Sequence, residues 1–458
     1  MNTCAVVLAA GEGKRMRSKY AKVVHRAAGK PLVCWVRDAL TRAGAREQVY
    51  IVGHRQEQVR AILGEDVAFV LQDQLLGTGH AVMQASQFLE GRDGATFVMC
   101  ADAPLVRPET LAAVQKQFEM EDCAAVLITA EAADPFGYGR VVRNDHGEVC
   151  GIVEEKDANP DEKQIHEINS GMYLFNTALL LSVIGKIGCQ NNQNEYYLTD
   201  TIAALIEEGH RVSSFKAEYE ETLGVNDRLQ LQQASAVLNK RILEDHMKQG
   251  VTIIDPEQVW IEPDVRIGQD VVIWPGCHIS GKTVIADDCV IGPDTSLTDV
   301  EVGQRVHLEK TTAKKCRISQ GCMVGPYVHI RANSDIGAFC RIGNFAEIKN
   351  ARLGPHCQIS HQCYIGDADI GERVTIGSNC SVANYDGIAK NRTIVGSFAF
   401  VGSNCSLVSP VHIKEYAYVA AGSVVTEDVP QYALAIGRAR QINKEEWVLR
   451  RKNLRNKG

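Results

Sequence analysis

The second half of the chain carries an aliphatic residue at every sixth position over long stretches. An α-helix cannot keep this period, because 3.6 residues per turn would spread those side chains around its axis. Three six-residue sides instead form one coil, and stacked coils bury a continuous column of aliphatic side chains. The pattern therefore predicts a hexapeptide-repeat β-helix of about nine coils, roughly 40 Å long at ~4.8 Å per coil. The repeats run through Ile267–Leu297, Ile318–Ile348, Leu353–Ile365, Ile370–Val382 and Val395–Val425.

Glycines follow the repeating aliphatic residue in many of these hexapeptides. We expect them to form tight corners with positive φ, which glycine adopts without steric cost. They are Gly268, Gly292, Gly337, Gly343, Gly366, Gly371, Gly377, Gly396 and Gly402.

Nine of the 15 cysteines lie in the repeats, each two residues before a repeating aliphatic. Residues two apart on a strand face the same way, so we expect these thiols to point into the coils as small hydrophobic groups. No CxxC pair is present, which disfavours a metal site or a disulfide framework. Buried free thiols are typical of a reducing compartment.

Composition narrows the class of protein. A chain of 458 residues should hold two or more domains. The net charge of −7 argues against nucleic acid as the main partner. The apolar run at the N-terminus is too short to span a bilayer, and a glycine-rich loop follows it where a signal peptide would need a cleavage site. We therefore expect a cytoplasmic protein that does not bind membranes.

The order of elements predicts four segments. Residues 1–227 alternate strands and helices, which predicts a Rossmann-like α/β domain with a mostly parallel sheet covered by helices on both faces. Residues 228–250 should form a connecting helix, 251–437 the β-helix, and 438–458 a basic tail. The tail is either solvated or an arm that reaches a phosphorylated ligand. Predicted strands are Cys4–Ala10, Gln48–Val52, Ala95–Cys100 and Ala124–Thr129; predicted helices are Lys30–Ala43 and Thr110–Phe118.

A glycine-rich segment, Leu8–Met16, follows the first strand. Glycines let the backbone approach phosphates, and amide groups there bind anions. Arg15 and Lys22 can neutralise a triphosphate. The segment is neither a dinucleotide fingerprint nor a P-loop. Its full pattern, LxxGxGxRM followed by a lysine, resembles the signature of sugar-nucleotide pyrophosphorylases.

Further segments match the same family in order. The stretch Gly77-Thr78-Gly79-His80, preceded by Gln72, resembles its uracil-recognition loop. Asp102 in Cys-Ala-Asp-Ala-Pro resembles its metal aspartate, although Ala101 replaces the usual glycine. The resemblance implies that Arg15 and Lys22 are catalytic and that Asp102 and Asn226 hold Mg²⁺. It implies binding of UTP and UDP-N-acetylglucosamine by Leu8, Ala9, Gly11, Lys22, Gln72, Gly77, Thr78, Gly139, Glu154, Asn169 and Asn226.

These residue types suit nucleotidyl transfer. A sugar 1-phosphate oxygen attacks the α-phosphorus of UTP, and pyrophosphate leaves. The protein mainly positions and neutralises the phosphates. Mg²⁺ prefers oxygen ligands and keeps several waters, so one carboxylate and one carbonyl beside the substrate phosphates suffice.

A second group of polar residues interrupts the repeats. The segments Gly343–Lys349, Ser360–Asp367 and Asn384–Gly387 resemble the acetyltransferase half of the family of bifunctional N-acetylglucosamine-1-phosphate uridylyltransferase / glucosamine-1-phosphate N-acetyltransferases, the GlmU family. With the N-terminal half, the resemblance covers essentially the whole chain. It implies a left-handed β-helix and a homotrimer with active sites between subunits.

The resemblance assigns roles in this second site. His361 is the expected general base, since imidazole titrates near neutral pH and the substrate ammonium must lose a proton before it attacks a thioester. Arg331, Lys349 and Tyr364 are expected to hold glucosamine 1-phosphate, and Asn384 to orient the base or the amine. The role of position 375, occupied by Thr375, is unknown. Acetyl-CoA, the co-substrate, is expected to lie near Ser403, Ala421 and Arg438, and Asn379 stands where the family commonly has glycine.

The leading hypothesis is a bifunctional enzyme of UDP-N-acetylglucosamine synthesis, which supports peptidoglycan and lipopolysaccharide-type envelopes. Acetyl transfer to glucosamine 1-phosphate precedes uridylyl transfer. One alternative keeps only nucleotidyl transfer, with the β-helix as a trimer-forming and regulatory module. Another is a purely structural rod.

Overall fold

A computed structural model describes residues 2–455 of the chain. The chain divides into two compact units, Met1–Arg241 and Ile242–Gly458, each of which is described separately. Within residues 2–455, none of the helices combines the length and the apolar character that a bilayer span requires.

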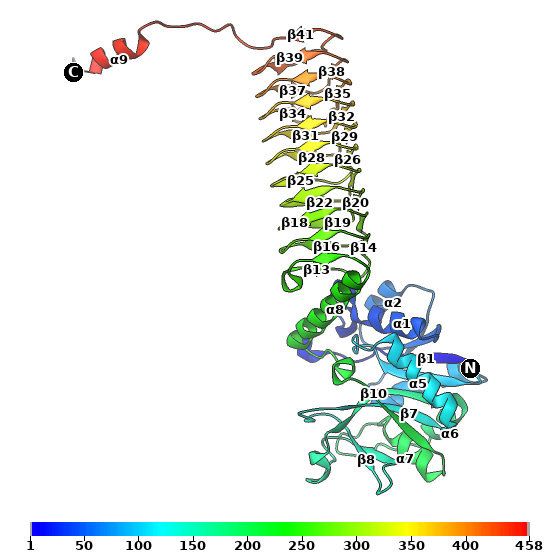
Figure 1. Ribbon diagram of the computed structural model, residues 1–458. Coiled ribbons are helices and arrows are strands. Elements are labelled where there is room, and N and C mark those ends of the chain that lie inside the picture. Colours follow the sequence, from blue (N-terminus) through cyan, green and yellow to red (C-terminus); the bar gives the residue numbers. More distant parts are fainter. Residues whose placement is uncertain (1, 456–458) are drawn as a thin grey trace. The chain divides into compact units, whose positions relative to one another are not determined.

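The first unit is built on a mixed sheet with the order β11-β7-β10-β6-β1-β4-β5, to which the β8–β9 hairpin is attached (Figure 1). Strand β1 pairs in parallel with β4 and β6, whereas β10 runs antiparallel to both β6 and β7. The strands are β1 (Thr3–Leu8), β4 (Glu47–Val52), β5 (Ala68–Leu71), β6 (Ala95–Cys100), β7 (Ala125–Glu131), β8 (Arg140–Arg143), β9 (Val149–Val153), β10 (Glu167–Asn176) and β11 (Val212–Lys216), with a separate pair β2 (Arg26–Ala27) and β3 (Lys30–Pro31).

Helices cover both faces of this sheet, as the alternation of apolar runs predicted. Successive side chains of β1 enter opposite cores: Val7 packs with Leu40 of α1 on one face, and Val6 packs with Leu180 of α6 on the other. The helices are α1 (Leu32–Arg42), α2 (Gln56–Leu63), α3 (Thr78–Met83), α4 (Ser86–Leu89), α5 (Pro108–Glu121), α6 (Thr177–Ile184) and α7 (Asp200–Glu207), with short 3-10 turns η1 (Lys14–Met16), η2 (Lys22–Val24), η3 (Glu162–Gln164) and η4 (Tyr219–Thr222). Helix α8 (Arg228–Lys248), at the predicted connecting helix, begins in this unit and ends in the second.

The predicted strand at Ala95–Cys100 coincides with β6, and the other predicted elements of this unit differ from the observed ones by a few residues at their ends. The predicted helix Thr110–Phe118 is longer in the structure because Pro108 begins α5, where a missing backbone N–H costs nothing.

The second unit is a left-handed parallel β-helix whose short strands stack into three sheets of 11, 10 and 9 strands among the described residues (Figure 1). The first sheet contains β12 (Thr252–Ile253), β15 (Val272–Ile273), β18 (Val290–Gly292), β21 (His307–Glu309), β24 (Met323–Val324), β27 (Arg341–Ile342), β30 (Gln358–Ile359), β33 (Thr375–Ile376), β36 (Phe400–Val401), β39 (Tyr418–Val419) and β41 (Leu434–Ala435).

The second sheet faces a different side of the coil. It contains β13 (Trp260–Ile261), β16 (His278–Ser280), β19 (Ser296–Thr298), β22 (Thr311–Lys314), β25 (Val328–Ile330), β28 (Glu347–Lys349), β31 (Tyr364–Gly366), β34 (Ser381–Ala383), β37 (Ser406–Val408) and β40 (Val424–Val425).

The third sheet closes the triangle. It contains β14 (Arg266–Ile267), β17 (Val284–Ile285), β20 (Glu301–Val302), β23 (Arg317–Ile318), β26 (Asp335–Ile336), β29 (Arg352–Leu353), β32 (Ala368–Ile370), β35 (Thr393–Val395) and β38 (Val411–Ile413). A 3-10 turn η5 (Pro256–Gln258) lies between β12 and β13, and the helix α9 (Trp447–Arg455) follows the last strand. Residues 456–458 of the predicted basic tail lie outside the described residues.

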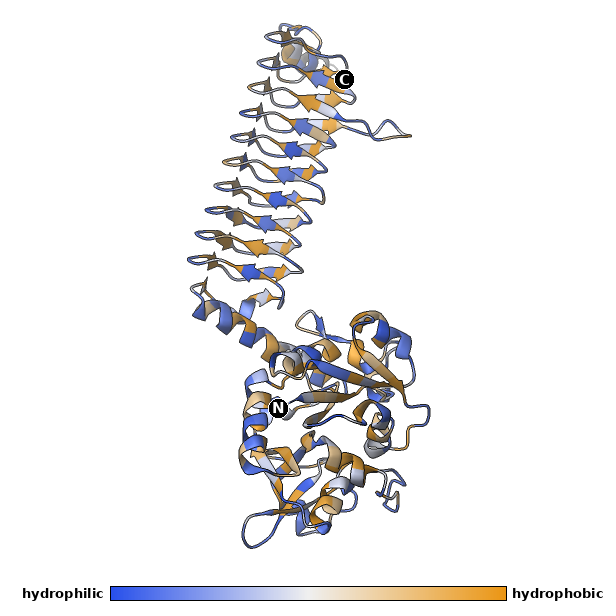
Figure 2. Ribbon diagram, turned by 90° about the vertical axis from the view of Figure 1, so that its right-hand side faces the viewer, coloured by the Kyte–Doolittle hydropathy of each residue, from blue (hydrophilic) through white to orange (hydrophobic). Residues whose placement is uncertain are grey.

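The stack is longer than the aliphatic repeat indicated, because strands pair from Thr252 to Ala435 rather than from 267 to 425. The terminal coils use residues that break the six-residue pattern, such as Ala435, although they lie within the predicted β-helix segment 251–437. Figure 2 shows the coils with one hairpin that projects from them near the C-terminal end.

The predicted reason for the glycines was wrong. None of the nine has φ in the left-handed region, which is used instead by residues such as Asp288, Phe345 and Asn379. The glycines are needed because the next coil lies too close. A Cβ on Gly337 would lie 2.6 Å from the backbone of Gly354, and one on Gly396 would lie 2.5 Å from the backbone nitrogen of Glu415.

The nine repeat cysteines are buried in the β-helix core, as predicted. Several thiols also donate hydrogen bonds to glycine carbonyls of the next coil. The Sγ–O distance is 3.1 Å from Cys322 to Gly337 and 2.9 Å from Cys357 to Gly371. A thiol therefore fills the core and satisfies a corner carbonyl that would otherwise have no partner.

Candidate active sites

A cavity of about 300 Å³ opens at the carboxyl ends of β1 and β6 in the first unit. Many of the predicted nucleotide-binding residues line it, although they come from distant parts of the sequence. Ligands commonly bind at this edge of an open α/β sheet. The lining includes Leu8, Ala9, Gly11, Lys22, Gln72, Gly77, Thr78 and Asp102 from the predicted set.

The loop at Gly77 is held tightly against the segment before α7. Gly77 has φ of +109°, and a Cβ there would lie 2.5 Å from the Tyr196 carbonyl oxygen. The buried Gln72 amide donates to the Gly77 carbonyl at 3.2 Å. Gly77 and Gln72 therefore shape one wall of the cavity, and the exposed Thr78 stands at its mouth.

Lys22 and Asp102 line this cavity, and Asn226 contacts Lys22 beside it. The Lys22 ammonium donates to Asp102 Oδ2 and, at 3.1 Å, to Asn226 Oδ1. The Val225 backbone N–H donates to the Asp102 carbonyl oxygen at 2.8 Å, which ties the two segments together. Asp102 and Asn226 thus direct oxygen atoms at one cation, and oxygen ligands of this kind suit Mg²⁺.

Arg15 occupies a more open position. It lies on the turn η1, is exposed, and lines a hollow of about 230 Å³ with Lys22 and Asn226. Neighbouring Lys14 pairs with Glu12 at 2.6 Å instead. Arg15 is therefore close to the Lys22 cluster, and its side chain is free to approach a ligand from solvent.

Glu154, Gly139 and Asn169 form a separate group beside the β8–β9 hairpin. Asn169 N–H donates to the Gly139 carbonyl oxygen at 2.8 Å, and a Cβ on Gly139 would lie 3.5 Å from Glu154 Oε1. Burial raises the pKa of Glu154, and a hydrogen bond from Thr199 at 3.3 Å offsets part of that effect. Thr199 was not identified from the sequence, because only the fold brings the start of α7 to this hairpin.

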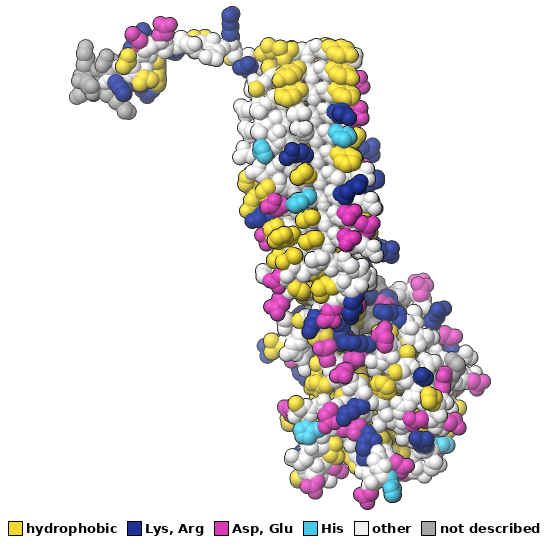
Figure 3. All heavy atoms as spheres, viewed as in Figure 1, with side chains coloured by type: hydrophobic (Ala, Val, Ile, Leu, Met, Phe, Trp, Pro, Cys, Tyr) yellow, Lys and Arg dark blue, Asp and Glu magenta, His cyan; other side chains and the backbone are white. Residues whose placement is uncertain are grey.

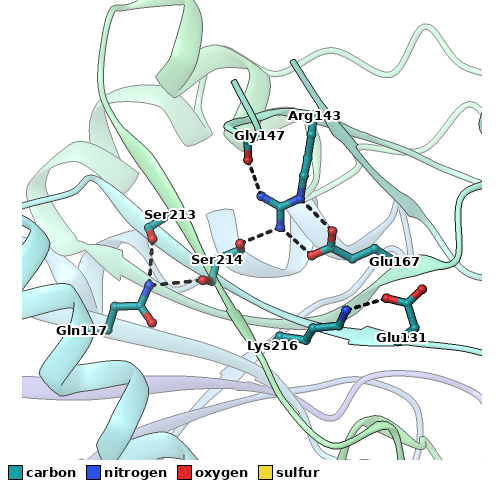
Figure 4. A network of polar contacts seen from close by, with 8 residues as sticks. All are labelled: Gln117, Glu131, Arg143, Gly147, Glu167, Ser213, Ser214 and Lys216. Atoms are coloured by element: carbon teal, nitrogen blue, oxygen red, sulfur yellow. Dashed lines mark hydrogen bonds and ion pairs between the residues drawn. The ribbon is translucent and has the colours of Figure 1, made fainter. Parts of the chain in front are cut away.

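A polar network fixes the position of this hairpin (Figure 4). Arg143 of β8 makes two hydrogen bonds to Glu167 of β10, at 2.6 and 2.7 Å, and a third to the Ser214 hydroxyl of β11 at 2.8 Å. Bidentate arginine–carboxylate pairs fix orientation as well as distance. Gly139 directly precedes β8 and Asn169 lies on β10, so the pair joins the two strands that carry the sugar-pocket candidates.

His361 lies at the corner between β30 and β31 of the β-helix and is exposed. Gly343 of the preceding coil makes room for its ring: a Cβ there would lie 2.7 Å from His361 Nδ1. The Asn379 N–H donates to the His361 carbonyl oxygen at 2.8 Å. His361 lines a hollow of about 330 Å³ together with residues such as Arg341 and Gln358.

Three cations, Arg331 after β25, Lys349 at the end of β28 and Lys390 in the loop between β34 and β35, lie close together on the β-helix. The proximity of Lys390, together with Arg331, lowers the pKa of Lys349. Arg331 also pairs with Glu347 at 2.8 Å. Tyr364 stands on β31, in register with Glu347, and its hydroxyl lies over Gly366. Clustered cations with too few acidic partners form a site suited to an anion such as phosphate.

Two further positions on the β-helix are Thr375, for which no role was predicted, and Asn350, which the sequence analysis did not identify. Thr375 lies on β33, in register with Gln358 and Phe400. Asn350 was not singled out from the sequence, but its amide donates to Asp367 at 2.5 Å. Its place one coil below Asp367 could have been found from the 17-residue spacing of neighbouring corners.

Family models match parts of both units. The family described as MobA-like NTP transferase domain matches residues 5–157. Bacterial transferase hexapeptide (six repeats) matches 264–299 and 315–350, and hexapeptide repeat of succinyl-transferase matches 392–427. A solved structure of UDP-glucose pyrophosphorylase complexed with UDP-glucose aligns with 53% of this chain and 100% of that chain, at 19% identity and a TM-score of 0.43.

Full-length relatives are considerably more similar. A bifunctional protein GlmU from Halalkalibacterium halodurans is 47% identical over 99% of this chain and 100% of its own length. Those from Acetivibrio thermocellus and Clostridioides difficile are 46% and 42% identical, each over 98% of both chains. With a nucleotidyltransferase unit and a hexapeptide β-helix in one polypeptide, the chain belongs to the family of bifunctional GlmU proteins and is a bifunctional transferase.

Proposed function

We propose that this protein makes UDP-N-acetylglucosamine in two steps. The β-helix transfers an acetyl group from acetyl-CoA to glucosamine 1-phosphate. The α/β domain then transfers uridylyl from UTP to N-acetylglucosamine 1-phosphate and releases pyrophosphate. The observation that supports the proposal best is that Lys22, Asp102 and Asn226, far apart in sequence, contact one another beside a cavity at the edge of the sheet. On the β-helix, the group of Arg331, Lys349 and Lys390 and the exposed His361 supply the chemistry that acetyl transfer needs.

In the uridylyl step, the cavity residues around Gly11 and Gln72 would bind UTP, and Lys22 and Arg15 would offset charge on its phosphates. Glu154, Gly139 and Asn169 would hold the sugar. Mg²⁺ fits the donor set of Asp102 and Asn226, since both oxygens already face one cation; when bound, it would neutralise phosphate charge and orient the phosphates. The Lys22 ammonium would then leave the Asp102 and Asn226 oxygens and could bind a phosphate itself.

In the acetyl step, His361 would take a proton from the C2 ammonium of the sugar, so that the nitrogen can attack the acetyl carbonyl and the CoA thiolate leaves. The Arg331–Lys349–Lys390 group would bind the sugar phosphate. The exposed position of His361 beside Gly343 supports this role, because a base must be reached by its substrate.

A homotrimer is part of the proposal. Aromatic rings stack from coil to coil on the β-helix surface: Phe398 on Tyr416 with centroids 4.8 Å apart, and the partly buried Phe400 on the exposed Tyr418 at 4.5 Å. Figure 3 shows hydrophobic side chains aligned along the β-helix surface. Such rows are typical of interfaces. Sedimentation should give a trimer; a clean monomer of 50.2 kDa would contradict this part.

One assay tests the two-step proposal. Purified protein receives UTP, Mg²⁺, acetyl-CoA and glucosamine 1-phosphate, and free CoA and pyrophosphate are measured. We expect both products, with pyrophosphate dependent on acetyl-CoA. Pyrophosphate from N-acetylglucosamine 1-phosphate without any CoA release would leave only the nucleotidyl function. In a cell, loss of these activities should impair peptidoglycan and lipopolysaccharide-type envelope synthesis, with the enzyme in the cytoplasm.

A further inference from the structure

Three polar residues form a column at one corner of the β-helix. Asn350, Asp367 and Asn384 are each 17 residues apart and follow the successive strands β28, β31 and β34. The Asn350 amide donates to Asp367 Oδ1 at 2.5 Å, and the Asn384 amide donates to Asp367 Oδ2. Asp367 is therefore held between two amides, one from the coil below and one from the coil above.

Backbone conformation does not account for the whole column. Asn350 and Asp367 have φ of 47° and 49°, and asparagine and aspartate tolerate this left-handed conformation well. Asn384 is not among the residues with positive φ. An amide side chain at that corner is thus explained by its hydrogen bond and not by a requirement of the turn.

The chemistry of Asp367 decides how the Asn384 amide is oriented. Asp367 is 7% exposed. Burial would raise its pKa, but the hydrogen bonds from Asn350 and Asn384 and the nearby lysine charges lower it overall, which favours the ionised carboxylate. An ionised carboxylate only accepts hydrogen bonds, so Asn384 must present its NH₂ group to it. The side-chain oxygen Oδ1 of Asn384 then faces away from Asp367, and no residue within 2–455 donates to it, whereas the Asn384 backbone carbonyl oxygen accepts from the Asn391 N–H at 2.7 Å.

We propose that Asp367 is a positioning residue of the acetyltransferase site. By holding the Asn384 NH₂ group, it directs the side-chain oxygen Oδ1 of Asn384 away from itself, where Oδ1 accepts an N–H from the C2 amine of the sugar. This inference rests on the proposed acetyl transfer. The cations Arg331, Lys349 and Lys390 recognise the phosphate end of the substrate, and Asn384 recognises its amine end. Without Asp367, the amide at 384 can turn over and present its NH₂ group, which repels an ammonium.

The test compares two ligands that differ at C2. Glucosamine 1-phosphate has the amine, whereas 2-deoxyglucose 1-phosphate has no donor there and serves as a competitive inhibitor. Asp367→Asn keeps the shape but can donate to the Asn384 oxygen. We expect the KM for glucosamine 1-phosphate to rise by about 10–100-fold, as for a lost hydrogen bond to a charged group. The Ki of the 2-deoxy compound and the KM for acetyl-CoA should change by less than about twofold.

Two further variants complete the design. Asn384→Ala, which keeps Asp367, should lose the same discrimination between the two ligands. Asp369→Asn is the matched control, since Asp369 lies on the adjoining strand β32 and pairs with Arg392 at 2.5 Å rather than with Asn384. In this variant the ratio of the KM for glucosamine 1-phosphate to the Ki of the 2-deoxy compound should equal that of the wild type. Melting temperature and sedimentation of each variant show whether it is folded.

The outcomes separate the two proposals. Suppose that the wild type transfers acetyl and that Asp367→Asn weakens the binding of both ligands equally, so that the ratio of KM to Ki is unchanged. The positioning role of Asp367 is then wrong. If the wild type itself transfers no acetyl to glucosamine 1-phosphate, the proposed function fails instead. A loss of discrimination in Asp367→Asn and Asn384→Ala, but not in Asp369→Asn, supports the inference.

Discussion

The Lys22 ammonium forms an ion pair with the Asp102 carboxylate in which the two side chains are only 14% and 15% exposed. The pair joins residues 80 positions apart, and Asn226 accepts a second hydrogen bond from the same ammonium. A cation is therefore already favoured between Asp102 and Asn226, and the free ammonium would be available for phosphate once Mg²⁺ binds there.

Asp102→Ala should abolish uridylyl transfer and leave acetyl transfer intact. It removes the only carboxylate of the proposed metal pair, so we expect pyrophosphate release to fall by at least about 10²–10³-fold. CoA release from acetyl-CoA should match the wild type. Asp145→Ala, at an exposed turn of the same unit, is the control. Near-normal pyrophosphate release by Asp102→Ala at saturating Mg²⁺ would show that the metal assignment is wrong.

His361→Ala should slow acetyl transfer by about 10²–10⁴-fold, the usual contribution of a general base. Acetyl-CoA binding and uridylyl transfer should change little. Higher pH should partly rescue the variant, because more of the substrate amine is then neutral. Initial rates of CoA release across pH measure both effects.

His356 is the natural control for this experiment, since it is five positions away but packs differently. Its ring stacks on Phe339 with centroids 5.2 Å apart. His356→Ala should therefore retain acetyl transfer. Loss of transfer in His356→Ala with retention in His361→Ala would reverse the assignment of the base.

Glu154→Gln should stabilise the α/β unit at alkaline pH. Burial raises the pKa of Glu154 above its value of 4.5 in an unfolded chain, so the folded state prefers the protonated form. Its contribution to stability is complete below that value and is lost as pH rises through the folded pKa. A neutral glutamine avoids this loss, so its urea midpoint should exceed the wild type at pH 8 and equal it at pH 4. Glu65→Gln, at an exposed site, should show no such pH dependence; an equal gain at both pH values would contradict the explanation.

Gly337→Ala should destabilise the β-helix although Gly337 has no positive φ. The new Cβ would lie 2.6 Å from the Leu353 carbonyl oxygen and from the Gly354 backbone, and overpacking of this kind costs about 1–3 kcal/mol. Gly185→Ala, where a Cβ would meet nothing within 4 Å, should be tolerated. Chemical denaturation of the two variants measures the difference. Equal stability would mean that the coils separate easily to admit a methyl group.

Periodicity alone revealed much of the architecture. A six-residue repeat fits only a coil with three sides, and so the β-helix, its buried aliphatic column and its inward-facing thiols could be predicted. Buried apolar runs located β1, β4, β6 and β7, because a strand enclosed on both faces is apolar at every position. The Leu8–Met16 pattern likewise predicted a loop that lines the cavity of the α/β unit, and its role in nucleotide binding stays a prediction.

The tertiary structure decided which residues meet. The repeat glycines were expected to adopt positive φ, because tight corners often require it. They are needed instead because a neighbouring coil, about 18 residues further on, packs closely against them, and no single hexapeptide reveals that contact. The same holds for Thr199 against Glu154 and for Asn350 and Asn384 against Asp367. Sequence patterns report the periodic burial of side chains, whereas polar contacts depend on register between distant segments, and that register is set only when the chain packs.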